Sequence, residues 1–209
     1  MPDLPNLDCL LADTRSVLEE LIASAPFLKD YVLVGGSSLA LHICHRKSEY
    51  LDFFTYRDHF DTRAILEYIK RFPQREFINN NSDQLDLLLN GVKLTFFNAH
   101  WSFLTPNSIC SFNLASINAI AAMKTNTLFI RAEYRDYYDL YSLVKQGMTL
   151  REIFNAAQNI LDSINYKLFC IALTYIDDIQ DDDIDHLYPK DKVTKREIRH
   201  FFEQRIVCE

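Results

Sequence analysis

The chain has 209 residues, of which 48% are hydrophobic, and a formal net charge of −7 at pH 7. This length and composition are enough for a buried core and exclude an intrinsically disordered chain. The negative charge argues against a protein that grips nucleic acid through its overall field, because such binding requires clustered Lys and Arg. No apolar run reaches the roughly 20 residues of a transmembrane helix, so we expect no membrane span.

Five cysteines occur at widely separated positions without the spacing of a metal site: Cys9, Cys44, Cys110, Cys170 and Cys208. An odd number of scattered cysteines is typical of free thiols in a reducing compartment. The N-terminus lacks the basic segment and apolar run of a secretory signal. We therefore expect free thiols and a cytoplasmic protein.

The first half of the chain mixes helical and extended patterns. Apolar residues at helical spacing predict helices over residues 12–24, 38–44 and 61–71. Short apolar runs predict strands over residues 31–34, 51–55, 76–78, 84–89 and 92–97. Asn90-Gly91 joins the last two strands and predicts a tight hairpin, because both residues accept positive φ. The expected sheet is therefore mixed, with an antiparallel part.

After Pro106 the pattern contains helices alone, over about residues 114–131, 134–146, 149–162, 165–176 and 194–206. The sequence thus predicts an α/β (α+β) fold, with a small mixed sheet flanked by helices over residues 1–110 and a helical domain over residues 111–209. An acidic stretch between the last two helices is interpreted as a solvated loop rather than a cation site, because its carboxylates have no scaffold around an ion.

A glycine turn follows the first predicted strand, in the order Gly35-Gly36-Ser37, and Asp52 lies on the second strand. Such a turn at the start of a helix lets backbone N–H groups approach a phosphate, and the helix dipole favours the anion. A carboxylate on the neighbouring strand offers the oxygen ligand that Mg²⁺ prefers. The pattern predicts a phosphate site with Asp52 as a metal ligand.

A second polar cluster lies in the helical half. Lys124 interrupts a small apolar segment, and Arg135, Asp136 and Asp139 follow at spacings that place them on one helix face. Spacing alone is typical of surface salt bridges. The surrounding aromatic residues indicate instead that this stripe is partly buried, where charge serves chemistry or partners.

Together these motifs resemble the AbiEii/AbiGii toxin group of the nucleotidyltransferase superfamily, which has a polymerase-β-like core. The group carries Gly-Gly-Thr/Ser, then His-Arg, then Ser-x-Asp-Leu-Asp-Phe-Phe, and this chain has Gly35-Gly36-Ser37, His45-Arg46 and Asp52-Phe53-Phe54. It also carries Ala-x-Lys, an arginine and Arg/Lys-Asp-Phe/Tyr-x-Asp-Leu-Tyr, which match Lys124, Arg131, Arg135, Asp136, Asp139 and Tyr141. The likeness spans about residues 30–206.

The resemblance implies transfer of a nucleotidyl group from a nucleoside triphosphate to an RNA or protein acceptor with Mg²⁺. It also implies an abortive-infection toxin with a cognate antitoxin. Lys124 would contact the phosphates and Asp136 would assist catalysis, with Asp139 in support; which of the two aspartates acts stays open. Residue chemistry adds Arg46 to the nucleotide site, because its guanidinium would fork onto phosphate oxygens. The resemblance also implies that Arg131 and Arg135 bind the nucleotide.

Two positions depart from the group's pattern. Tyr50 stands where the first aspartate of Asp-x-Asp belongs, and a phenol keeps its proton at neutral pH. Thr95 stands where a third carboxylate often lies, and Asp86 across the hairpin is either its replacement or an ordinary exposed strand residue. The alternatives are thus an active nucleotidyltransferase, a catalytically weakened relative that still binds nucleotide or a partner, and a different enzyme or a structural protein on the same fold.

Overall fold

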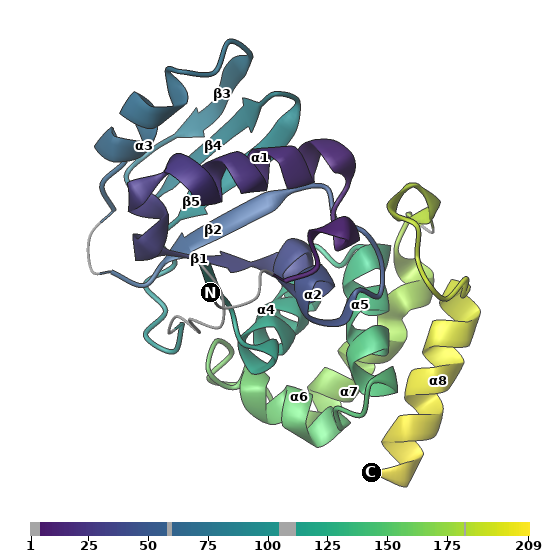
Figure 1. Cartoon of the computed structure of the whole chain (residues 1–209). Helices are drawn as coiled ribbons and strands as arrows, with labels where there is room; N and C mark the ends of the chain where they lie inside the picture. The colour runs from purple at the N-terminus through teal and green to yellow at the C-terminus, as the bar shows by residue number, and fades with distance from the viewer. Residues whose placement is uncertain (1–4, 58–59, 105–111, 182) are drawn as a thin grey trace. The chain divides into compact units, whose positions relative to one another are not determined.

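A computed structural model describes residues 5–57, 60–104, 112–181 and 183–209 (Figure 1). The chain forms two compact units, which we call the sheet unit (Met1–Ser116) and the helical unit (Ile117–Glu209). The boundary expected after residue 110 lies outside the described residues. Within the described ranges, no helix is long and apolar enough to cross a membrane.

The sheet unit contains η1 (Leu7–Cys9), α1 (Ala12–Ser24), η2 (Pro26–Asp30), β1 (Tyr31–Val34), α2 (Gly35–Ile43), β2 (Leu51–Thr55), α3 (Arg63–Ile69), β3 (Arg75–Asn80), β4 (Gln84–Leu89), β5 (Val92–Phe97) and β6 (Asn113–Leu114). Its described strands form a six-stranded sheet in the order β3-β4-β5-β2-β1-β6. The pairs β1–β6 and β2–β5 are parallel, and the other neighbours are antiparallel. The predicted mixed sheet is confirmed.

Alternation along the strands gives this sheet one apolar face. Phe53 of β2 and Phe96 of β5 are fully buried and stack with their ring centroids 5.3 Å apart. Helix α1 covers that face with Val17, Leu18 and Leu21, and Figure 1 shows it (purple) running across the strands. Because side chains alternate along a strand, the residues between these apolar positions lie on the opposite face.

The hairpin between β4 and β5 has the predicted turn, with φ of 50° at Asn90 and 81° at Gly91. Several element boundaries differ from the predictions by a few residues, and one of these differences has a clear cause. The helix expected from residue 114 begins at Ile117, because Asn113 and Leu114 pair in parallel with β1. A two-residue strand has no periodicity of its own, so the sequence does not reveal it.

The helical unit contains α4 (Ile117–Ile130), α5 (Tyr134–Lys145), α6 (Leu150–Ala157), α7 (Tyr166–Thr174), η3 (Tyr175–Asp178), η4 (Asp185–Leu187) and α8 (Lys195–Cys208). All five predicted helices are present, and α6 is shorter than expected. Tyr137, Phe169 and Phe202 are fully buried and anchor the core of this unit.

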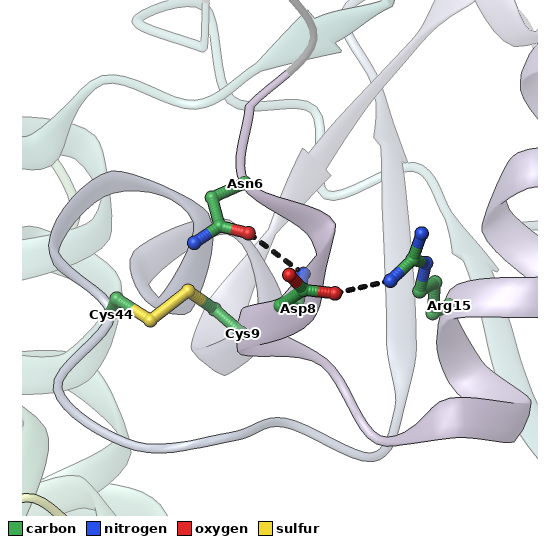
Figure 2. The surroundings of a disulfide bond; sticks show 5 residues. All are labelled: Asn6, Asp8, Cys9, Arg15 and Cys44. Atoms are coloured by element: carbon green, nitrogen blue, oxygen red, sulfur yellow. Dashed lines mark hydrogen bonds and ion pairs between the residues drawn. A yellow bond between two sulfur atoms is a disulfide. The ribbon is translucent and has the colours of Figure 1, made fainter.

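Cys9 and Cys44 form a disulfide, with their Cα atoms 5.3 Å apart (Figure 2). The prediction of free thiols is therefore wrong for these two residues. It holds for Cys170 and Cys208, whereas Cys110 lies outside the described residues. The pairing escapes sequence analysis because a tertiary contact creates it: the segment after η1 forms a parallel β-bridge with Ser48, which lies just beyond Cys44.

Candidate functional site

The glycine turn connects β1 directly to α2. Gly35 has φ of +66°, a left-handed conformation that favours glycine. A Cβ atom at Gly35 would lie 3.1 Å from Oδ2 of Asp52. At Gly36, a Cβ atom would lie 2.6 Å from Nη2 of Arg46. Gly35 therefore needs glycine for its backbone conformation, whereas a side chain at Gly36 would displace the guanidinium of Arg46.

Ser37 ties the first turn of α2 to the segment that leads into β2. Its Oγ lies 3.0 Å from Oγ of Ser48 and donates a hydrogen bond to the carbonyl oxygen of Tyr50. The helix begins at Gly35 with Val34 as its N-cap, and no side chain caps it. Ser37 therefore fixes the strand that carries Asp52, and its buried hydroxyl serves this tether.

Arg46 is a buried residue whose guanidinium packs against the same glycine turn. Its residue surface is only 3% exposed, and Nη1 donates to the carbonyl oxygen of Lys47 at 2.9 Å. With Nη2 lying against Gly36, the guanidinium holds the α2–β2 connection against the glycine turn. The structure thus brings together Gly35, Gly36, Ser37, Arg46 and Asp52, as the sequence motifs predict.

Tyr50 and Thr95 occupy the two positions where carboxylates are missing. Tyr50 is 37% exposed and precedes β2, whereas Thr95 is buried in β5 directly beside Asp52. Among the residues that the structure describes, no group of three or more His, Cys, Asp and Glu side chains is placed to hold a metal ion. Any cation at Asp52 would therefore depend on fewer protein carboxylates than the family pattern supplies.

A buried ion cluster lies in the helical unit, between α4 and α5. Nζ of Lys124 lies 2.8 Å from Oδ1 of Asp136 and 2.6 Å from Oδ2 of Asp139. The side chain of Lys124 is 7% exposed, and both aspartates are fully buried. The surface salt-bridge interpretation of this stripe is therefore wrong for these three residues.

Two arginines and a glutamate extend the cluster toward solvent. Arg131 pairs with Glu133 and places Nη1 3.6 Å from Oδ2 of Asp136, while Nε of Arg135 lies 2.5 Å from Oε2 of Glu133. Sequence analysis missed Glu133, although its position three residues before Asp136 is capping-box spacing. The backbone N–H of Glu133 indeed donates to Asp136 at 3.3 Å.

The charge of Asp136 reflects a competition between burial and its neighbours. Burial alone raises the pKa of this carboxyl, but the nearby Lys124 and Arg131 outweigh that effect and leave the pKa below its usual value. Asp136 is therefore ionised at neutral pH. Three cations and three carboxylates make up the extended cluster, so its charges balance.

Comparisons with known proteins identify relatives that match most of the chain. The family model described as "Nucleotidyl transferase AbiEii toxin, Type IV TA system" matches residues 16–205. An Aquifex aeolicus protein, "Uncharacterized protein aq_aa25", is 27% identical over 202 residues, which cover 94% of this chain and 96% of the relative.

Solved structures share the fold. JHP933 from Helicobacter pylori matches with a TM-score of 0.56 at 16% identity, covering 94% of both chains. The nucleotidyltransferase toxin MenT4 (Rv2826c) from Mycobacterium tuberculosis H37Rv matches with a TM-score of 0.53 at 14% identity, covering 91% of this chain and 84% of its own. Because the family model covers most of the sequence, the chain belongs to the AbiEii nucleotidyltransferase toxin family.

Proposed function

We propose that this protein transfers a nucleotidyl group from a nucleoside triphosphate to an RNA or protein acceptor in the presence of Mg²⁺. The observation that carries the proposal is the carboxylate of Asp52 beside Gly35, at the point where β1 turns into α2. The turn offers backbone N–H groups to phosphate, and the carboxylate offers a hard oxygen ligand. When bound, Mg²⁺ would neutralise phosphate charge during the transfer.

The remaining residues take roles that follow from their contacts. Ser37 and Arg46 hold the turn in shape, so that the backbone of Gly35 and Gly36 stays accessible to phosphate. We assign Lys124 the positive charge that stabilises the triphosphate, with Arg131 and Arg135 on its solvent side. Complete burial of Asp136 and Asp139 supports a positioning role, in which they hold the ammonium of Lys124 in place.

A toxin role with a cognate antitoxin belongs to the same proposal. The family model is described as part of a type IV toxin–antitoxin system, and MenT4 is titled a toxin. Abortive infection would be the setting in which such a toxin acts.

Label transfer tests the enzymatic proposal. Purified protein is incubated with each of the four α-³²P-labelled nucleoside triphosphates and total RNA or protein, with and without Mg²⁺. We expect Mg²⁺-dependent labelling that Asp52→Asn reduces at least about 10- to 100-fold, since even second-shell groups around metals contribute this much. Glu76→Gln, an exposed carboxylate change on β3, is the matched control and should leave labelling unchanged. Labelling that survives Asp52→Asn would contradict the proposal.

A second candidate function is nucleotide binding without turnover. It is favoured by Tyr50 and Thr95, neither of which supplies a carboxylate at its family position. This alternative predicts that triphosphates bind to the protein while no label reaches any acceptor.

A further inference from the structure

Aromatic side chains gather at the face of the sheet opposite α1. Phe54 of β2 and Phe97 of β5 are paired across the parallel ladder, and their ring centroids lie 5.0 Å apart. The ring of Trp101 lies 5.7 Å from that of Phe54, and the ring of Phe103 lies 5.7 Å from that of Trp101. We call Phe54, Phe97, Trp101 and Phe103 the aromatic cluster.

The rings of the aromatic cluster differ in burial from those on the α1 face. Phe53 and Phe96 are fully buried beneath α1, whereas every member of the cluster is only half-buried. A ring that serves core packing gains most when it leaves water completely. Half-buried rings that touch one another therefore form a surface on which a flat ligand can lie.

The aromatic cluster shares its face of the sheet with Asp52. Side chains alternate along a strand, so Asp52 and Phe54 point to the same face, about 7 Å apart along β2. The register repeats this relation on β5, where Thr95 pairs with Asp52 and Phe97 pairs with Phe54. The glycine turn follows Val34, which is the partner of Asp52 on β1. The cluster thus lies within one nucleotide's length of the proposed phosphate site.

A nucleobase is the ligand whose chemistry suits these rings. Every base has a flat π-face, and bases stack on aromatic side chains with little dependence on sequence. Sheets that bind single-stranded RNA use aromatic rings on adjacent strands in this way. Stacking does not require a strongly basic surface, which fits a chain with a formal net charge of −7.

We propose that the aromatic cluster is a nucleobase-binding site, in which Phe54, Phe97 and Trp101 stack on the base of a nucleotide bound beside Asp52. The base belongs either to the nucleoside triphosphate or to the terminal nucleotide of an acceptor RNA, since both present the same flat surface. The inference rests on the proposed function for the position of the nucleotide, but not for the stacking itself.

Trp101 makes stacking directly measurable, because it is the single tryptophan of the chain and a stacked base quenches indole fluorescence. The full-length protein is titrated in Mg²⁺ with each of the four nucleoside triphosphates, with a single-stranded oligoribonucleotide and with inorganic triphosphate. We expect a saturable loss of Trp101 emission with a probe that carries a base, and none with inorganic triphosphate. Loss with a nucleoside triphosphate identifies that molecule as the source of the base, whereas loss with the oligoribonucleotide alone identifies the acceptor.

Two outcomes of this titration would overturn the inference. One is unchanged emission with every probe that carries a base, which is also the result expected if a partner protein covers these rings. The other is an equal loss of emission with inorganic triphosphate, because that probe has no base to stack.

Variants that remove a ring separate stacking from packing. Phe54→Leu, Phe97→Leu and Trp101→Leu keep an apolar side chain, and each should weaken binding of the quenching probe at least about fivefold in isothermal titration calorimetry. Trp101→Phe retains a ring and should bind like the wild type. Phe77→Leu, which removes an exposed ring of β3, is the matched control and should also leave the affinity unchanged.

Circular dichroism confirms the fold of each variant. Unchanged affinity in the folded leucine variants would overturn the inference, as would equal losses in Trp101→Leu and Trp101→Phe. The comparison at Trp101 remains decisive even where Phe54→Leu or Phe97→Leu fails to fold.

The two proposals fail in different ways. If a base quenches Trp101 but no label is ever transferred, the base site stands and the nucleotidyltransferase proposal falls. If label transfer requires Asp52 while binding and transfer are both indifferent to the leucine variants, the enzyme stands and this inference falls.

Discussion

Asp136 shows how a single residue can link helix capping to a buried charge. It accepts a hydrogen bond from the backbone N–H of Glu133 at the start of α5. It also accepts a hydrogen bond from the ammonium of Lys124 on α4. Removing one member of such a cluster leaves the other buried charges with fewer partners, which destabilises the folded state. The same contacts lower the pKa of Asp136 despite its burial.

The lowered pKa of Asp136 predicts a pH dependence of stability. Because the folded-state pKa lies below the unfolded one, the ionised carboxylate stabilises the fold above about pH 4 and this contribution is lost as pH falls. Asp136→Asn should lower the free energy of unfolding at pH 7 by about 2–3 kcal/mol and flatten its decline between about pH 5 and 2. Urea denaturation at a series of pH values measures both effects.

Asp162→Asn is the control for that experiment, since it changes an exposed carboxylate of the same unit. It should retain the wild-type pH profile. An Asp136→Asn protein that keeps the full acid-dependent decline would show that this carboxylate does not carry the effect.

At the scale of elements, short segments are held by contacts distant in sequence. Asn6 and Asp8 order the turn of η1, and Asp8 pairs with Arg15 of α1 (Figure 2). Backbone bonds then join Cys9 and Leu11 to Ser48, at 3.2 and 3.0 Å. The disulfide therefore links two segments that are already joined by these backbone bonds. Ser48 in turn contacts Ser37 of the glycine turn.

The acidic stretch after α7 makes contacts with two helices that lie elsewhere in the sequence. Oδ2 of Asp181 accepts a hydrogen bond from the backbone N–H of Tyr134 at 2.9 Å, so it satisfies a free donor in the first turn of α5. Asp177 pairs with Arg199 of α8. These two carboxylates therefore stabilise neighbouring helices.

The Cys9–Cys44 disulfide should contribute measurably to stability. Its sequence separation of 35 implies that Cys9→Ala with Cys44→Ala lowers the free energy of unfolding by about 3–4 kcal/mol, through greater freedom of the unfolded chain. Urea denaturation with and without dithiothreitol measures this difference. Reductant should destabilise the wild type but not the double variant.

Cys208→Ala controls for loss of a thiol, because Cys208 is free and exposed. Its stability should respond to reductant as the wild type does. Four reactive thiols in native, unreduced protein from residues 9, 44, 170 and 208 would contradict the disulfide.

At the scale of the whole molecule, each unit has its own core, and the predicted site residues are divided between the two. Sequence motifs can assign residues to one function across such a division, but only a measurement on the intact chain shows that they serve one ligand. Stabilisation by nucleotide provides that measurement, since a ligand that binds only the folded state raises the free energy of unfolding.

Nucleoside triphosphate with Mg²⁺, at 100 times its dissociation constant, should stabilise the chain by about 2.7 kcal/mol. Thermal or urea unfolding with each triphosphate gives the value, and Asp52→Asn and Lys124→Met should both lose it. Stabilisation without label transfer would favour the nucleotide-binding alternative. No stabilisation by any triphosphate would contradict both proposed functions.

The sequence by itself determined the elements whose signals are local. The Asn90-Gly91 turn, the apolar strands and the helices of the second half are recognised from residues close together in the chain, because backbone preference and side-chain periodicity act over short distances. The same is true of the glycine turn with Asp52, whose spacing also identified the family. These features position most of the candidate site.

Only the tertiary structure decided which distant residues meet. The Cys9–Cys44 pairing, the two carboxylates around Lys124 and the burial of Asp86 all depend on packing between segments that no local pattern connects. A strand pattern such as Leu85-Asp86-Leu87 reports which face Asp86 occupies, but not whether that face is covered. Burial and charge pairing are properties of the assembled fold, and for this reason the interpretation of Asp86 as an ordinary exposed strand residue is wrong: it is only 7% exposed.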